Sequence, residues 1–125
     1  MSKDLLICIG DGDNIGDVID FYLLSNDLEN ASKFSFRVKV ALERIAVQAQ
    51  QQMEAHLVYV AGDDICFLVS SKYNVLEYLS VYSNQFFELT GKTISFGMGK
   101  NSAEASFCLR KAKVSGKGRV ISFGE

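Results

Sequence analysis

Two short acidic turns contain the residues of this sequence that are best suited to chemistry. The first is Gly10-Asp11-Gly12-Asp13, which directly follows an apolar run, and the second is Ala61-Gly62-Asp63-Asp64. Carboxylates gathered in one place repel one another unless protons or cations neutralise them, and oxygen ligands of this kind suit Mg²⁺ or Mn²⁺. If the two turns meet in the fold, they predict a site for divalent metal ions.

The chemistry that such a site predicts is nucleotidyl transfer. Two divalent ions about 3.5 to 4 Å apart can activate a hydroxyl group and stabilise a leaving pyrophosphate. Gly10 and Gly12 flank Asp11 and would let the backbone approach a triphosphate closely. A helix that starts after Asp13 would direct its free N–H groups toward phosphate. Asp13 itself has two interpretations, a further metal ligand or the cap of that helix.

Two other interpretations of the acidic turns compete with this one. The segment from Asp11 to Gly16 begins like a calcium-binding EF-hand loop. However, Ile15 stands where that loop needs an oxygen ligand, and Tyr22 stands where it needs a bidentate glutamate. Either turn alone would be an ordinary polar turn. Their expected position at adjoining strand ends favours the metal site.

The apolar pattern predicts the elements that position these turns. Apolar runs predict strands, and apolar residues at three- and four-residue spacing predict helices, with a break in the pattern at 25–30. In chain order these are strand 5–9, helix 15–24, helix 34–53, strands 57–61 and 65–69, helix 75–89, strand 93–98, helix 101–112 and strand 119–123. The order contains the β-α-β-β-α-β pattern of an α+β, ferredoxin-like fold, with an antiparallel sheet and an extra C-terminal helix and strand. In that topology the first strand lies beside the hairpin, which brings Asp11 to Asp63 and Asp64.

Composition limits the class of protein. With 125 residues, 48% hydrophobic and 22% charged, the chain is expected to form one domain over residues 1–125. It has no apolar stretch near the ~20 residues of a membrane-spanning helix, so we expect a cytoplasmic protein. A net charge of −2 argues against direct binding to nucleic acid. The cysteines lie apart in apolar runs and are expected to be reduced core residues: Cys8, Cys66 and Cys108.

The motifs resemble a known family along essentially the whole chain. The strand ending in Asp11-Gly12-Asp13-Asn14-Ile15-Gly16, followed by the hairpin with Gly62-Asp63-Asp64, resembles the polymerase palm domain of the large subunit of type III CRISPR complexes and the related GGDEF diguanylate cyclases. Residues 94–99 are similar to the GGDEF strand, and residues 109–116 to the Ala-Lys-x-x-Gly segment. Ala61 replaces a glycine, and Asp64 replaces the glutamate of GGDEF, which favours the CRISPR palm. A palm of this size most resembles the minimal CRISPR polymerase (mCpol) family.

The resemblance implies a role for each motif residue. Asp11 would be the first metal ligand, with the Gly12 carbonyl as a second. Asp63 would be the main hairpin ligand, and Asp64 would support it or bind the second of two Mg²⁺ or Mn²⁺ ions. Lys113 would contact the triphosphate, or else be a solvated lysine favoured by the helix dipole. The remaining residues expected to bind the nucleotide are Asp13, Asn14, Gly16 and Gly62.

The resemblance also implies a function and partners. A nucleoside triphosphate, with ATP expected, would be converted to a cyclic di- or oligonucleotide signal in antiviral defence. Each subunit of such cyclases presents one nucleotide to the other, which implies a homodimer. The expected downstream partner is an effector that senses the cyclic nucleotide, bound to a membrane. The alternative is a non-catalytic palm domain that binds a nucleotide or cyclic nucleotide and regulates a partner.

Overall fold

Nine helices and strands follow one another along residues 4–124, the part of the chain that the computed structural model describes. In chain order they are β1 (Leu5–Gly12), α1 (Ile15–Leu24), α2 (Leu28–Met53), β2 (His56–Ala61), β3 (Asp64–Ser70), α3 (Val75–Thr90), β4 (Ile94–Gly99), α4 (Ser102–Val114) and β5 (Val120–Ser122). The order and type of every predicted element are confirmed.

Most boundaries differ from the prediction by at most about two residues, but the start of α2 and the end of β1 differ by more, and both have a local cause. Helix α2 begins at Leu28, inside the segment predicted to interrupt the helices, because the Asp27 side chain accepts a hydrogen bond from the Asn30 N–H (3.1 Å) and caps its first turn. Strand β1 continues to Gly12, because it is paired on both sides. Asp11 lies opposite Asp64 on β3 and opposite Ser95 on β4. Asp11 is therefore held in the sheet and not in a turn.

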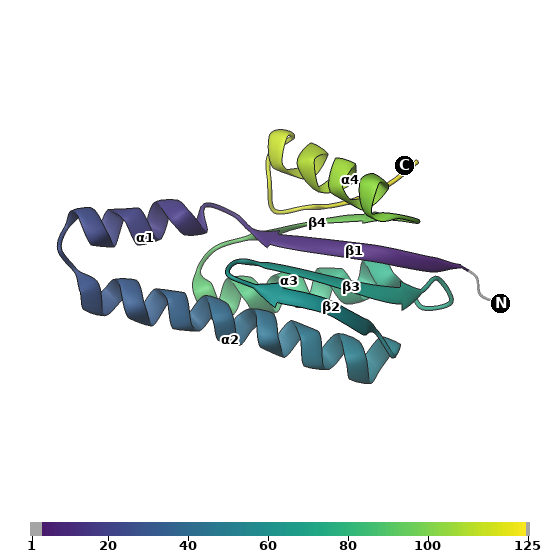
Figure 1. The fold of residues 1–125 in the computed structure, drawn as a ribbon, viewed down its shortest axis with the longest axis horizontal. Helices are drawn as coiled ribbons and strands as arrows, with labels where there is room; N and C mark the ends of the chain where they lie inside the picture. The colour runs from purple at the N-terminus through teal and green to yellow at the C-terminus, as the bar shows by residue number, and fades with distance from the viewer. Residues whose placement is uncertain (1–3, 125) are drawn as a thin grey trace.

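The sheet has the order β2-β3-β1-β4-β5. The pairs β2–β3, β3–β1 and β1–β4 are antiparallel, and the short β5 runs parallel to β4. The first strand therefore lies between the hairpin and β4, as the ferredoxin-like order predicts. Figure 1 shows β1 crossing the middle of the molecule, with the β2–β3 hairpin on one side of it and β4 on the other.

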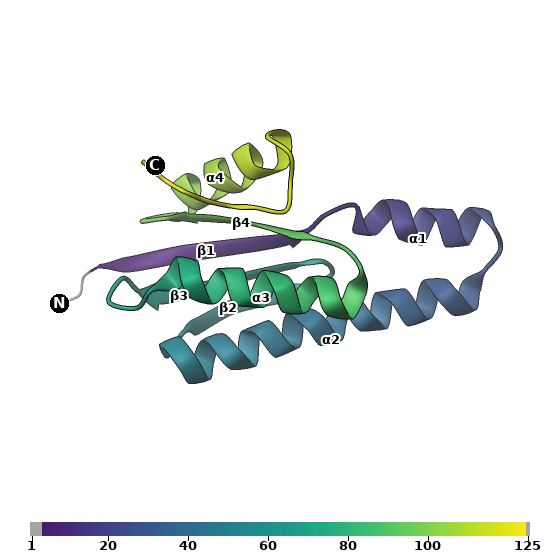
Figure 2. The same ribbon diagram turned by 180° about the vertical axis from the view of Figure 1, so that it is seen from behind.

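The core lies between one face of the sheet and helices α2 and α3, while α4 covers the opposite face at β4 (Figures 1 and 2). Burial of each large apolar side chain contributes about 1.5–3 kcal/mol before entropic costs. Fully buried members of this core include Leu42, Ile65, Phe67, Leu79, Tyr82, Phe86 and Phe96. Cys8, Cys66 and Cys108 are buried, which confirms the prediction that they are core residues.

Helix α4 packs closely on β4 because two residues there lack a side chain. A Cβ atom added at Gly97 would lie 2.3 Å from the Ala105 carbonyl oxygen and 2.3 Å from the Leu109 nitrogen. One added at Gly99 would lie 2.4 Å from Glu104 Cβ. These two glycines allow α4 to lie close to β4, and this distance determines where the side chains of its last turn are placed.

Helix α1 and the first half of α2 extend past the end of the sheet as a helical hairpin (Figure 1). Its tip exposes apolar side chains, including those of Phe21, Leu24 and Leu28. Across residues 4–124, none of the helices has both the length and the apolar character that crossing a bilayer requires.

Candidate active site

The two acidic segments meet at one end of the sheet. The pairing of Ala61 with Asp64 leaves Gly62 and Asp63 as a two-residue hairpin loop, in which Gly62 has φ 58°. Glycine adopts this left-handed conformation without strain. The Gly12 N–H donates a hydrogen bond to the Asp63 carbonyl (2.8 Å), which fastens the end of β1 to the loop. The predicted convergence of the two segments is confirmed.

Three carboxylates form the centre of this site. One side-chain oxygen from each of Asp11, Asp63 and Asp64 lies within 4.8 Å of the other two. All three residues are partly exposed, so the cluster is open to a ligand. Three carboxylate oxygens that converge in this way match the oxygen ligands that Mg²⁺ and Mn²⁺ prefer, so the donor set fits the metal that the sequence predicts.

Electrostatics at the cluster favour a neutralising partner. Burial raises the pKa of the Asp11 carboxyl, and the neighbouring charges of Asp63 and Asp64 raise it further against the opposing effect of Lys113. Burial, followed by the charge of Asp63, also raises the pKa of Asp64. Both shifts mean that the ionised cluster has an energetic cost in the metal-free protein.

Asp13 lies apart from the cluster in a buried network of hydrogen bonds. Its side chain is 1% exposed, and its oxygens accept hydrogen bonds from Thr93 Oγ1 (2.6 Å), Ser95 Oγ (2.8 Å) and the Gly118 N–H (2.9 Å). Of its two interpretations, the one in which Asp13 caps α1 is wrong, because Asn14 occupies the N-cap position with φ 60°. Because protein donors use both of its oxygens, Asp13 has a supporting place beside the three clustered carboxylates.

The charge on Asp13 is stabilised in this position. Burial alone would raise the pKa of its carboxyl, but hydrogen bonds from Lys113, Thr93 and Ser95, together with the Lys113 charge, outweigh that effect and lower it. Asp13 and Asp11 therefore have opposite pKa shifts although they are two residues apart.

Lys113 joins the carboxylate cluster to this network. Its Nζ lies 2.7 Å from Asp13 Oδ1 and 3.2 Å from Asp11 Oδ2, and it donates to the carbonyl oxygens of Asp11 and Gly12, each at 3.1 Å. Its side chain is only 21% exposed. The alternative that Lys113 is a solvated lysine at the helix end is therefore wrong.

The glycines of the first segment have a structural explanation. A Cβ atom at Gly10 would lie 2.4 Å from the Phe96 ring, and one at Gly12 would lie 2.7 Å from the Ile15 side chain. Their lack of a side chain is thus required by packing inside the protein. Gly16 differs, because a Cβ atom there would meet nothing within 4 Å. Of these three glycines, Gly16 is the one that leaves open space at the start of α1.

Lys117 is a charged neighbour of the site that motif reasoning did not single out. It adopts φ 64° in the loop after α4, and its Nζ donates to Asn14 Oδ1 (2.7 Å). The available signal was a cluster of basic residues late in the sequence, but a loop lysine cannot be placed from spacing alone. The cluster consists of Arg110, Lys111, Lys113, Lys117 and Arg119. Two lysines therefore contact the segment that joins β1 to α1.

A cavity of about 240 Å³ opens beside the carboxylates, between α1, α2 and the hairpin loop. Its walls are mostly apolar, and Ser35 and Asp63 contribute the polar side chains. The lining residues are Ile15, Gly16, Ile19, Ser35, Val38, Gly62 and Asp63. The structure thus brings the predicted residues Gly16 and Gly62 to one cavity next to the cluster.

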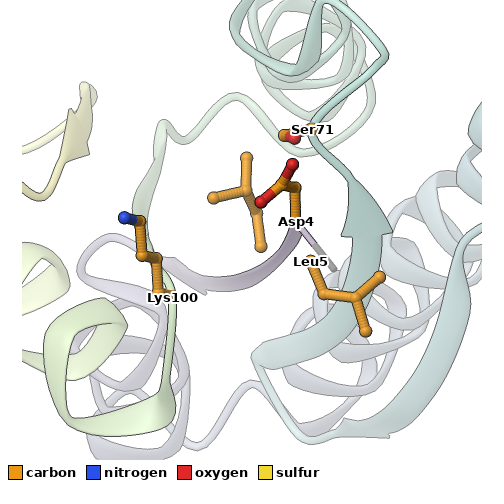
Figure 3. A pocket seen from close by; sticks show the side chains of 5 residues that line it. Asp4, Leu5, Ser71 and Lys100 are labelled. Carbon is orange, nitrogen blue, oxygen red and sulfur yellow. The ribbon is translucent and has the colours of Figure 1, made fainter. Parts of the chain in front are cut away.

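Another cavity, of about 260 Å³, lies at the opposite end of β1. Figure 3 shows Lys100 on one side of it and Asp4, Leu5 and Ser71 on the other. Asp4 is the single carboxylate among its lining residues. Because oxygen-rich metal sites need several ligands, we place the candidate active site at the hairpin end.

A known protein family matches almost the whole chain. The family model described as the minimal CRISPR polymerase domain (mCpol) matches residues 7–123. No curated protein matches the chain.

Solved structures share the fold at low sequence identity. The Csm1–Csm4 cassette in complex with cA4 is 20% identical over 93% of this chain (TM-score 0.69), and the same cassette with one ATP is 20% identical over 94% (TM-score 0.69). In both cases this chain spans only 20% of the chain it matches. The active GGEEF domain of a diguanylate cyclase from Vibrio cholerae is 15% identical over 98% of this chain and 85% of that chain (TM-score 0.66).

Proposed function

Because the chain belongs to the minimal CRISPR polymerase family, we propose that it is a metal-dependent nucleotidyltransferase that converts nucleoside triphosphates into a cyclic di- or oligonucleotide. The observation that carries the proposal is the convergence of Asp11, Asp63 and Asp64 within 4.8 Å beside Lys113. ATP is the proposed substrate, which is supported by the ATP found with a protein of the same fold.

The carboxylates of Asp11, Asp63 and Asp64 are the proposed holders of Mg²⁺ or Mn²⁺, two ions per site, with the Gly12 carbonyl as a further ligand. When bound, such ions lower the pKa of an attacking hydroxyl and stabilise a leaving pyrophosphate. The single histidine does not offer an alternative base. His56 begins β2, and the six-residue length of that strand separates it from the hairpin loop by roughly 17 Å at about 3.3 Å per residue.

The triphosphate is proposed to lie between the carboxylates and the start of α1. Lys113 and Lys117 both contact the segment joining β1 to α1 and supply positive charge there. The first N–H groups of α1, at Ile15 and Gly16, have no partner within the helix and favour an anion. These groups bind and orient the phosphates, while the side chain of Asn14 is held by Lys117.

The cavity between α1 and α2 is the proposed site for the base. Its volume of about 240 Å³ and its apolar walls suit a flat heterocycle. Ser35 offers a hydroxyl that can both donate and accept, as the edge of adenine requires.

Formation of a cyclic product requires two nucleotides with their reactive ends facing. Each chain provides one cluster of metal ligands among its described residues, so a homodimer with facing sites is the proposed active form. The product would act on an effector that senses cyclic nucleotides at a membrane, in antiviral defence.

The deciding experiment uses purified protein with each nucleoside triphosphate and Mg²⁺ or Mn²⁺, followed by mass spectrometry of the products. We expect ATP to give a cyclic di- or oligoadenylate and pyrophosphate. Asp63→Asn should lower turnover by at least a hundredfold while leaving the circular dichroism spectrum unchanged, since it removes a ligand charge from an exposed loop. Asp20→Asn, on the exposed part of α1, is the matched control.

Three outcomes have distinct meanings. Full activity in Asp63→Asn would refute the ligand assignment. Absence of pyrophosphate with every nucleotide would refute the proposed nucleotidyltransferase activity. Tight nucleotide binding without turnover would instead support the non-catalytic palm domain.

A further inference from the structure

We propose that Lys113 is a built-in cation of the metal site, which Asp13 anchors so that a divalent ion and the lysine compete for the same oxygens. The inference rests on the proposed function, because it concerns the same ligands. It goes further by assigning Asp13 and Lys113 a joint positioning role that controls how tightly the site takes up its ion.

The contacts of the Lys113 ammonium carry the proposal. Four oxygens lie within 3.2 Å of Nζ. One is the Asp11 carboxylate and another is the Gly12 carbonyl, both of them proposed metal ligands. An ammonium has three N–H donors, so it cannot satisfy four acceptors fully at once. A cation that approaches Asp11 and Gly12 therefore meets a positive charge already bound to them.

Asp13 is positioned to keep its contact with Lys113 when the ammonium leaves the oxygens of Asp11 and Gly12. Its carboxylate is 1% exposed and is fixed by Thr93, Ser95 and the Gly118 N–H. The shortest contact of Nζ is also with Asp13, at 2.7 Å. Because an unpaired buried carboxylate is costly, the ammonium keeps this partner while its contacts with Asp11 and Gly12 are exchanged.

This arrangement couples the cation to the triphosphate. In the metal-free protein, Lys113 offsets part of the charge of the three clustered carboxylates. Once a divalent ion takes up that role, the lysine is released toward the side on which the phosphates are proposed to bind, still tied to Asp13. A positive charge thus offsets part of the negative charge of the carboxylates both before and after the divalent ion binds.

The test measures Mn²⁺ affinity without nucleotide, by isothermal titration and by the electron paramagnetic resonance signal of free Mn²⁺. Lys113→Met should bind Mn²⁺ about tenfold more tightly than the wild type, a change equivalent to about 1.4 kcal/mol. Lys117→Met removes a nearby positive charge from a side chain that contacts Asn14 and none of the proposed metal ligands. It should change the Mn²⁺ affinity less than about threefold, roughly 0.6 kcal/mol.

Asp13→Asn should act in the opposite direction. Without its anchor, the ammonium is left with Asp11 as its anionic partner, and Mn²⁺ binding should weaken. The double variant Asp13→Asn with Lys113→Met removes both charges of the buried pair, which keeps the folded protein neutral at that point. It should again bind Mn²⁺ more tightly than the wild type, and it serves as the decisive variant if Lys113→Met alone fails to fold.

The outcomes separate this inference from the proposed function. Mn²⁺ binding by the wild type, with no gain in the folded Lys113→Met or double variant, would overturn the competition alone. An equal gain in Lys117→Met would also overturn it, because a general charge effect would then be sufficient. If the wild type and all variants bound no Mn²⁺, the proposed metal site would fail as well.

Discussion

Asp11 and Asp13 show how two identical side chains, two residues apart in one motif, reach different chemical environments. Asp11 points toward Asp63 and Asp64, and burial raises its pKa. Asp13 points toward hydroxyl, amide and ammonium donors, which lower its pKa against the effect of burial. Such a difference is not readable from Asp-Gly-Asp, because the donors to Asp13 come from residues at least 80 positions later in the chain.

The opposite shifts predict how the metal-free protein responds to pH. A carboxyl whose pKa is raised on folding contributes stability that is present below its unfolded pKa, near 3.9, and is lost as the pH rises through its folded value. Asp11 and Asp64 therefore destabilise the metal-free protein at pH 7 relative to a pH below about 4. Asp13, with a lowered pKa, contributes stability that is lost only as the pH falls below about 4.

Urea denaturation in EDTA checks this prediction. Asp64→Asn should be more stable than the wild type at pH 7, by about 1 kcal/mol or less, and the gain should shrink as the pH falls toward 4. Asp20→Asn provides the control at an exposed position. A destabilised Asp64→Asn variant at pH 7 would contradict the repulsion inferred for the cluster. Addition of Mg²⁺ should stabilise the wild type more at pH 7 than at about pH 4.

At the scale of elements, the sequence predicted the fold well because each element carries its own signal. The apolar stripes of α2 and α3 and the apolar runs of β3 and β4 gave the order and the hairpin. The start of α2 was missed because the polar residues at its first turn look like a loop until Asp27 is seen to cap them. The end of β1 was missed because glycine and aspartate have low strand propensity, and pairing on both sides overrides it.

The packing of α4 on β4 gives a prediction at this scale. Gly97→Ala should destabilise the protein by at least about 2 kcal/mol, because the added methyl group meets backbone atoms of α4 that cannot move aside cheaply. Since α4 carries Lys113, Mn²⁺ affinity should change as well. Thermal denaturation measures the first effect.

Gly16→Ala is the matched control on α1. A Cβ atom there meets nothing within 4 Å, so this change should stabilise the protein by about 0.4–1 kcal/mol through the unfolded state. Equal effects of the two substitutions on stability would contradict the close packing of α4.

At the scale of the whole molecule, acidic and basic residues are concentrated in different parts of the chain. Residues 4–32 contain seven carboxylates and no lysine or arginine, while residues 92–124 contain seven lysines or arginines and one glutamate. The candidate site lies where these two segments meet. A dimer with facing sites would bring each acidic segment close to the basic segment of the other copy.

Self-association is therefore expected to depend on salt. Raising the salt concentration from about 50 mM to about 500 mM shortens the screening length from roughly 14 Å to roughly 4 Å, and should lower the dimer fraction seen in analytical ultracentrifugation. Lys111→Glu, on the exposed side of α4, should weaken the dimer more than Lys39→Glu, which lies outside the basic segment. A monomer that still forms cyclic product at every concentration would contradict the facing dimer.

The ion pair between Asp13 and Lys113 spans 100 residues, and this has a consequence for how the protein is made. During synthesis the carboxylates of β1 leave the ribosome long before α4, so the nascent chain carries its acidic residues without their counter-charge. Contacts of such long sequence separation form slowly, because the entropy of closing a long loop opposes them. The proposed triphosphate site would therefore be completed only after α4 has been synthesised, because a chain stalled before α4 lacks Lys113.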